Sequence, residues 1–146
     1  SNIYELCEEI AIKLRRLQKK AKTAGVELRG QYEIYGRKTF STHMYTGQEI
    51  FEAVLYTINR SLPEGYIRQI GVWVSNLTDE KNLPSPLFGR NMQNPKLLQT
   101  IDTINDKFGD HTIRNGFLLY ADKLTTVPNG YMADRYERMK LATTAL

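Results

Sequence analysis

The chain has 146 residues, 41% of them hydrophobic, which is typical of a single soluble domain with its own core. No apolar run reaches the ~20 residues of a membrane span, so we expect a cytoplasmic protein without membrane contact. Twenty basic against sixteen acidic residues give a net charge of +4, which favours polyanionic partners. The single cysteine, Cys7, excludes an internal disulfide, and we expect it in the core.

The first predicted element is an amphipathic helix from Asn2 to about Thr23, which Gly25 would end. Its apolar residues recur at three- and four-residue spacing: Ile3, Leu6, Cys7, Ile10, Leu14 and Leu17. Its outer face carries a run of basic residues: Lys13, Arg15, Arg16, Lys19, Lys20 and Lys22. Such a run could contact phosphate groups, but a run of charges is more often only the solvated side of a helix.

Two strands are predicted next, because the period of the apolar residues changes to two at Val26. The first strand would run to a turn at Tyr35-Gly36-Arg37, and the second would bury Phe40 and Met44. If the apolar residues share one core, these residues share the uncovered face: Arg29, Gln31, Arg37, Thr39, Ser41 and His43. Arginines and short hydroxyl side chains there suit phosphate oxygens. An antiparallel sheet that is wet on one side shows the same pattern without a ligand.

A second helix is predicted to begin at Thr46, with Glu49 as its partner in a capping box, and to end at Ser61 to Gly65. The third predicted strand, Ile67 to Leu77, turns its apolar residues toward the helices. Its other residues lie on the uncovered face or where the strand begins: Arg68, Gln69, Trp73 and Ser75. An exposed tryptophan could stack on a base, and the alternative is that another part of the chain covers it.

The rest of the chain divides into a linker and an extension. A polar, proline-rich stretch from Thr78 to Gly89 predicts an extended linker. Apolar spacing from Leu97 to Phe108 predicts a third helix, which Gly109 would end. We therefore expect a core at residues 1–77, a linker at residues 78–96 and a C-terminal extension at residues 97–146.

The sequence contains no recognisable catalytic constellation. One cysteine and two separated histidines, His43 and His111, do not make a zinc site, and no glycine-rich phosphate loop is present. Three acids recur at four-residue spacing on the third helix, where we expect solubilising charges: Asp102, Asp106 and Asp110. We predict no catalytic residue, no metal site and no cofactor in this chain.

Two segments resemble a known family. Residues 67–77 have the sequence Ile-Arg-Gln-Ile-Gly-Val-Trp-Val-Ser-Asn-Leu, and residues 101–114 have Ile-Asp-Thr-Ile-Asn-Asp-Lys-Phe-Gly-Asp-His-Thr-Ile-Arg. Both are similar to the C-terminal "little finger" of Y-family translesion DNA polymerases, in its bacterial DinB, UmuC and ImpB/MucB/SamB-like members. The resemblance covers roughly Ile3 to Arg114. It implies an α+β fold, with a small antiparallel sheet backed by two helices and a C-terminal helical extension.

The resemblance also implies a role. Ser1-Asn2 is typical of the remnant of a cleaved tag, and we expect a part of a longer, error-prone repair polymerase whose magnesium-dependent catalytic domains are absent here. This part would grip primer-template DNA through its phosphates without reading the sequence. The residues expected at the DNA are Arg29, Gln31, Arg37, Lys38, Thr39, Ser41, Arg68, Gln69, Trp73 and Ser75. Trp73 stands where family members often carry a basic residue.

Further partners are implied. A sliding-clamp peptide occupies the linker in relatives, and here its apolar anchors would be Leu83, Leu87 and Phe88. The alternative is that Leu87 and Phe88 only hold the linker to this domain. Two other classes fit the predicted fold: a protein-interaction module that binds no DNA, and a ligand-binding regulatory α+β domain.

The family domain begins with a strand that this chain lacks, so we expect an incomplete sheet. An apolar segment, Gly116 to Ala121, could fill the exposed edge. A second copy of the chain could do the same, which would make an oligomer.

Overall fold

The computed structural model describes residues 2–58, 65–83, 95–109 and 112–116. In these ranges the chain forms α1 (Asn2–Arg16), β1 (Lys19–Gly30), β2 (Glu33–Met44), α2 (Gly47–Ile58), β3 (Ile67–Asp79), a 3-10 turn (Glu80–Asn82) and α3 (Pro95–Phe108). The fold is α+β, as predicted.

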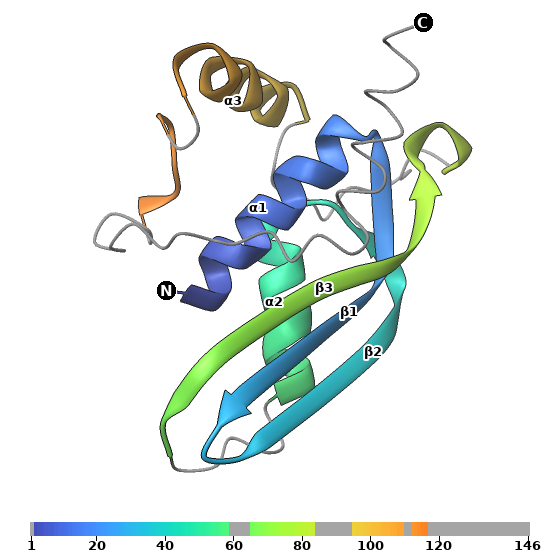
Figure 1. Ribbon diagram of the computed structural model, residues 1–146. Helices are drawn as coiled ribbons and strands as arrows, with labels where there is room; N and C mark the ends of the chain where they lie inside the picture. Colours follow the sequence, from blue (N-terminus) through green and yellow to red (C-terminus); the bar gives the residue numbers. More distant parts are fainter. Residues whose placement is uncertain (1, 59–64, 84–94, 110–111, 117–146) are drawn as a thin grey trace, which may run out of the picture.

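The three strands form one antiparallel sheet in the order β2-β1-β3, so β1 is paired on both sides. Val26 of β1 lies opposite Gly36 of β2 and opposite Val72 of β3. Figure 1 shows α2 behind the sheet, and no described helix covers the sheet's other face. The predicted small sheet with helices on one side is therefore confirmed.

The core lies between the helices and one face of the sheet. It consists mainly of fully or almost fully buried residues from α1, β1 and α2: Cys7, Ala11, Leu14, Ala24, Val26, Leu28, Ile50, Val54 and Ile58. Cys7 lies in this core, as predicted. Burial, and after it the nearby charge of Glu8, raises the pKa of Cys7 to about 12, which keeps the thiol protonated and unreactive at neutral pH.

The first helix is shorter than predicted. α1 ends at Arg16, and Gln18 has a left-handed backbone with φ of 53°. β1 then begins at Lys19, which pairs with Asp79 of β3. The segment Lys19-Lys20-Ala21-Lys22 has good helix formers, but pairing with a neighbouring strand overrides this local preference. The three lysines of this segment therefore belong to β1 and not to a helix face.

The first hairpin turns earlier than predicted. Arg29 of β1 pairs with Glu33 of β2, and the Gly30 N–H donates to the carbonyl oxygen of Tyr32 across the turn (3.2 Å). Tyr32, which lies in this turn, is 56% exposed. The predicted turn at Tyr35-Gly36-Arg37 is wrong. That segment and the observed turn at residues 30–32 both combine a glycine with a tyrosine, and only the pairing with β1 shows which of them is the turn.

α2 begins with the predicted capping box. The Thr46 hydroxyl accepts a hydrogen bond from the Glu49 N–H (3.2 Å), and the Glu49 carboxylate accepts one from the Thr46 N–H (3.1 Å). The same carboxylate accepts a third bond from the Tyr45 N–H (3.0 Å). These bonds satisfy backbone donors that have no partner within the helix. The segment predicted to end α2, residues 61–65, lies outside the described residues except for Gly65.

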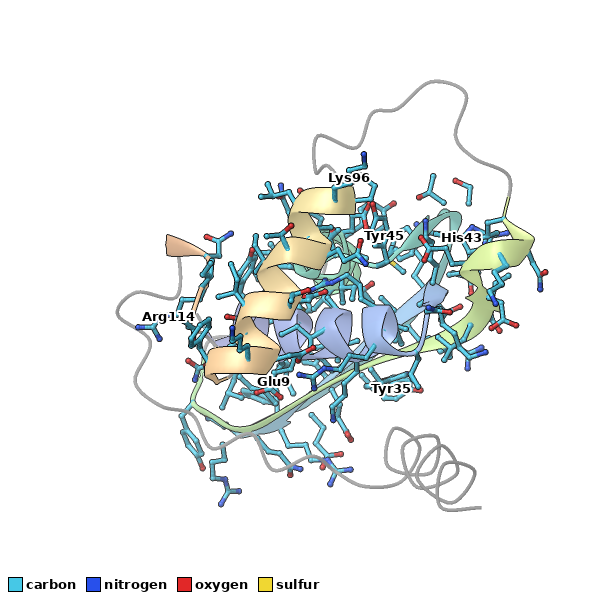
Figure 2. All side chains as sticks on the ribbon, turned by 90° about the horizontal axis from the view of Figure 1, so that it is seen from above. Glu9, Tyr35, His43, Tyr45, Lys96 and Arg114 are labelled. Atoms are coloured by element: carbon cyan, nitrogen blue, oxygen red, sulfur yellow. The ribbon has the colours of Figure 1, made fainter. Side chains whose placement is uncertain are left out.

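α3 lies beside α1, and Figure 2 shows the two helices from above. The Arg15 guanidinium donates two hydrogen bonds to the Asp102 carboxylate, at 2.6 and 2.7 Å, and both side chains are mostly buried. Arg16 pairs with Asp106 at 2.6 Å in a more exposed position. Asp102 and Asp106 were predicted to be solubilising charges; instead they hold α3 to α1. Asp110 lies outside the described residues.

The sheet has two outer strands, β2 and β3, and the structure describes no further strand beside either of them. Apart from Gly116, the segment predicted to fill an edge lies outside the described ranges. An added strand, whether from this chain or from a second copy, stays a prediction. The predicted division into core, linker and extension has the same status.

Replacing Thr46 by alanine is expected to lower the free energy of unfolding by about 0.5–2 kcal/mol, because it removes the hydroxyl of the capping box. Urea denaturation would measure the change. Thr103→Ala, which removes an exposed hydroxyl from α3, is the control and should change the urea midpoint less. Equal effects of the two substitutions would contradict a capping role for Thr46.

Asp102→Asn should weaken the attachment of α3, because the Arg15 guanidinium would lose its charged acceptor in a mostly buried place. We expect the opening free energy of the α3 amides, measured by hydrogen exchange, to fall by about 1–3 kcal/mol. Asp106→Asn removes the more exposed pair and should cost only about 0–1 kcal/mol. An equal loss of protection in the two variants would show that the buried pair does not hold α3.

Candidate nucleic-acid interface

The face of the sheet opposite the core presents four rows of residues that lie side by side on β2, β1 and β3. Val26 and Leu28 point into the core, so the alternate residues of β1 point to the other side. Directly paired residues share a face. The rows, which together we call the open face, are Thr39-Thr23-Ser75, Arg37-Gly25-Trp73, Tyr35-Glu27-Gly71 and Glu33-Arg29-Gln69.

The first row contains three hydroxyl groups, of which the central one, that of Thr23, is fully buried. The hydroxyls of Thr23 and Thr39 are hydrogen bonded at 2.8 Å, and the Asn76 amide donates to the Thr23 hydroxyl at 2.8 Å. When Thr23 uses its own proton for the bond to Thr39, the Thr39 proton is left for an outside acceptor. Thr39 is exposed and can therefore donate to a phosphate oxygen.

The charges of the open face are few. Arg29 is bound to Glu27 of the same strand, with N···O distances of 2.6 and 2.8 Å, so its charge is largely balanced. Arg37 is exposed and forms no ion pair with a residue that the structure describes. Glu33, in the outermost row, is a second carboxylate, so the formal charge of the four rows is zero and any attraction for an anion is local to Arg37.

An aromatic pair lies across the middle of the open face. The Trp73 ring covers Gly25 so closely that a Cβ atom at Gly25 would collide with it. The Tyr35 ring lies 5.3 Å from the Trp73 ring, centroid to centroid, with 31° between the planes. Figure 2 shows Tyr35 on the side of the sheet away from the helices. The cover that Trp73 receives is thus Tyr35, a residue that the sequence analysis did not select for the site.

Lys38 does not join the open face. Its ammonium lies 3.9 Å from the centroid of the Tyr56 ring in α2, on the helix side of the sheet. Arg37 and Lys38 are neighbours in β2, and successive side chains of a strand point to opposite faces. Lys38 was expected beside Arg37 only from the family resemblance, and the alternation along β2 puts the two side chains on opposite faces.

Three further predicted residues border the open face, and two of them lie at one end of the sheet. The Gln31 N–H donates to the carbonyl oxygen of Tyr66 in the turn region (3.1 Å). Arg68 lies near the start of β3, over the Tyr66 ring at 5.7 Å. Ser41 is exposed on β2, beyond the last regular pair at Thr39. These three therefore border the four rows instead of lying within them.

The predicted run of basic residues is mostly neutralised. Lys19 pairs with Asp79 at 2.8 Å and Lys20 pairs with Glu80 at 3.3 Å. Lys22 lies in the irregular part of β1 and forms no ion pair in the described ranges. Partial burial, and after it the charges of Lys22 and Lys20, lowers the pKa of His43, so this imidazole is neutral at pH 7.

Other kinds of site have less support. Among the described residues no group of three or more His, Cys, Asp or Glu side chains could hold a metal ion. A cavity of about 250 Å³ lies between α1, α3 and the start of α2, but Arg15 and Asp102, which line it, are already bound to each other. No described helix is long and apolar enough to cross a membrane. Of the predicted clamp-binding residues only Leu83 is described, and it is half-buried.

Gly25→Ala should displace the Trp73 ring, because the added methyl group would occupy its place. We expect a red shift of the tryptophan emission and a loss of about 1–3 kcal/mol in the free energy of unfolding. Gly71→Ala is the matched control, since its Cβ would meet Glu27 only at ordinary contact distance (3.8 Å). If Gly25→Ala left both the emission and the urea midpoint unchanged, Trp73 would not lie on Gly25.

Comparison with known proteins agrees with this architecture. Residues 1–86 match the family model described as the impB/mucB/samB family C-terminal domain, which is more than half of the chain. A curated relative, DNA polymerase IV 2 of Halalkalibacterium halodurans, is 28% identical over 117 residues. The match covers 77% of this chain but only 29% of that relative. The chain belongs to the impB/mucB/samB C-terminal domain family, the little-finger domains of Y-family DNA polymerases.

Proposed function

We propose that the open face binds the phosphate backbone of primer-template DNA without reading the base sequence. The observation that carries the proposal is Arg37, an exposed cation without a described ion pair, next to the donor hydroxyl of Thr39 on an uncovered sheet. Guanidinium and hydroxyl donors bind phosphate oxygens and carry no base specificity. Membership of a DNA polymerase family makes DNA the polyanion to test first.

The number of available cations sets the strength of binding. Arg37, Arg68 and Lys22 form no ion pair with a described residue, whereas Glu27 holds Arg29. Each phosphate neutralised contributes roughly 0.9 to the slope of log affinity against log salt. Three contacts therefore give a slope of about 3 at most. Binding should be weak and easily reversed by salt, which suits a part that positions DNA while other domains act on it.

We further propose that the longer protein is a translesion DNA polymerase. The relative that supports this is named a DNA polymerase, and this chain spans less than a third of it. In that protein the domain would hold the duplex and leave the chemistry to other parts. Binding of a sliding clamp through Leu83, Leu87 and Phe88 is a separate proposal, and the last two residues lie outside the described ranges.

Arg37→Ala should weaken binding to a labelled primer-template duplex and lower the salt slope by about 0.9, whatever the duplex sequence. Fluorescence anisotropy across a salt series would measure both quantities. The matched control is Lys38→Ala, which removes the same charge one residue away but on the helix side of the sheet. It should leave the salt slope closer to that of the unchanged protein.

Two results would contradict the proposed function. One is binding that does not depend on salt or that strongly prefers one duplex sequence. The other is an equal effect of Arg37→Ala and Lys38→Ala, because it would show that only the net charge matters and that the open face has no special part.

A further inference from the structure

The phosphate binding proposed above uses Arg37 and Thr39 and does not explain the aromatic pair on the open face. Trp73 and Tyr35 come from the two outer strands and meet over the central strand. Tyr35 is 68% exposed, although a pair that served only to stabilise the sheet would gain from deeper burial. The pair therefore leaves an aromatic surface open to a ligand.

The surroundings of the pair leave room for a flat ligand. Gly25 lies under the Trp73 ring, and Gly71 ends the row Tyr35-Glu27-Gly71, in which the Glu27 carboxylate is bound to Arg29. Neither glycine has a side chain that could rise beside the rings. Arg37 lies in the same row as Trp73, so a cation stands next to the aromatic surface.

These features suit a nucleotide whose base is unpaired. A base in a duplex has both faces covered by its neighbours in the stack, whereas an unpaired base can stack on an aromatic side chain. The phosphate of the same nucleotide would lie within reach of a cation such as Arg37. A plain duplex could use Arg37 but not the aromatic faces.

We propose that the Tyr35–Trp73 pair stacks on an unpaired base, so that the domain prefers a primer-template junction with a single-stranded overhang to a blunt duplex. The inference rests on the proposed function, because it assumes that the open face binds DNA. To that proposed function it adds a preference for one form of DNA, the duplex with a single-stranded overhang.

Trp73 is the only tryptophan of the chain, so its intrinsic fluorescence reports on the pair directly. The full chain would be titrated with three DNAs: a blunt duplex, the same duplex with a single-stranded overhang, and the overhang strand alone. We expect the overhang and the single strand to quench the emission and the blunt duplex to quench it far less.

Variants separate stacking from charge. Tyr35→Leu should lower the affinity for the overhang DNA by about 5- to 100-fold, the range for loss of one stacked base, and lower the affinity for the blunt duplex much less. Tyr35→Phe keeps the ring and should retain the preference. The matched control is Tyr56→Leu, which removes an exposed tyrosine from α2 on the helix side and should leave the preference unchanged.

The outcomes distinguish this inference from the proposed function. If all three DNAs bind in a salt-dependent way with equal quenching, or if Tyr35→Leu affects them equally, the stacking proposal is overturned and phosphate binding survives. If none of the DNAs binds at any salt concentration, both proposals fail.

Discussion

The antiparallel pairing of β1 with both of its neighbours determines most of what this domain can do. Because β1 is central, Val26 and Leu28 on one side must be covered, and α1 and α2 supply that cover. The residues between them then point away from the helices. The same pairing that forms the core thus fixes which side chains from three strands meet on the open face.

Gly25 makes room for the aromatic pair on the open face. It lies between core residues of β1, and its missing side chain lets the Trp73 ring lie close to the central strand. Tyr35 can then reach across from β2. A larger residue at position 25 would raise the tryptophan off the sheet and separate the pair. The aromatic surface therefore depends on a residue that contributes no atom of its own to binding.

Local patterns predicted the elements whose signals are local. The capping box at Thr46 and Glu49 and the strand from Ile67 were confirmed, and Arg37 and Thr39 were correctly assigned to the uncovered face. The predictions for the end of α1 and for the first hairpin turn were wrong, because the first depends on pairing with the distant β3 and the second on the register of β1 against β2.

Contacts between residues distant in the sequence were also missed. Tyr35 was not selected because its partner Trp73 lies far away in the sequence, whereas Lys38 was expected at the DNA from the family resemblance and lies on the helix side of the sheet. The pair between Arg15 and Asp102 joins residues 87 positions apart, which no local pattern reveals.

Nuclear magnetic resonance would test the central claim most directly, by following the arginine Nε–H and tryptophan indole N–H signals as primer-template DNA is added. We expect Arg37 and Trp73 to shift while Arg15, fixed to Asp102 behind the sheet, does not; shifts of Arg15 without any change at Arg37 and Trp73 would contradict the account.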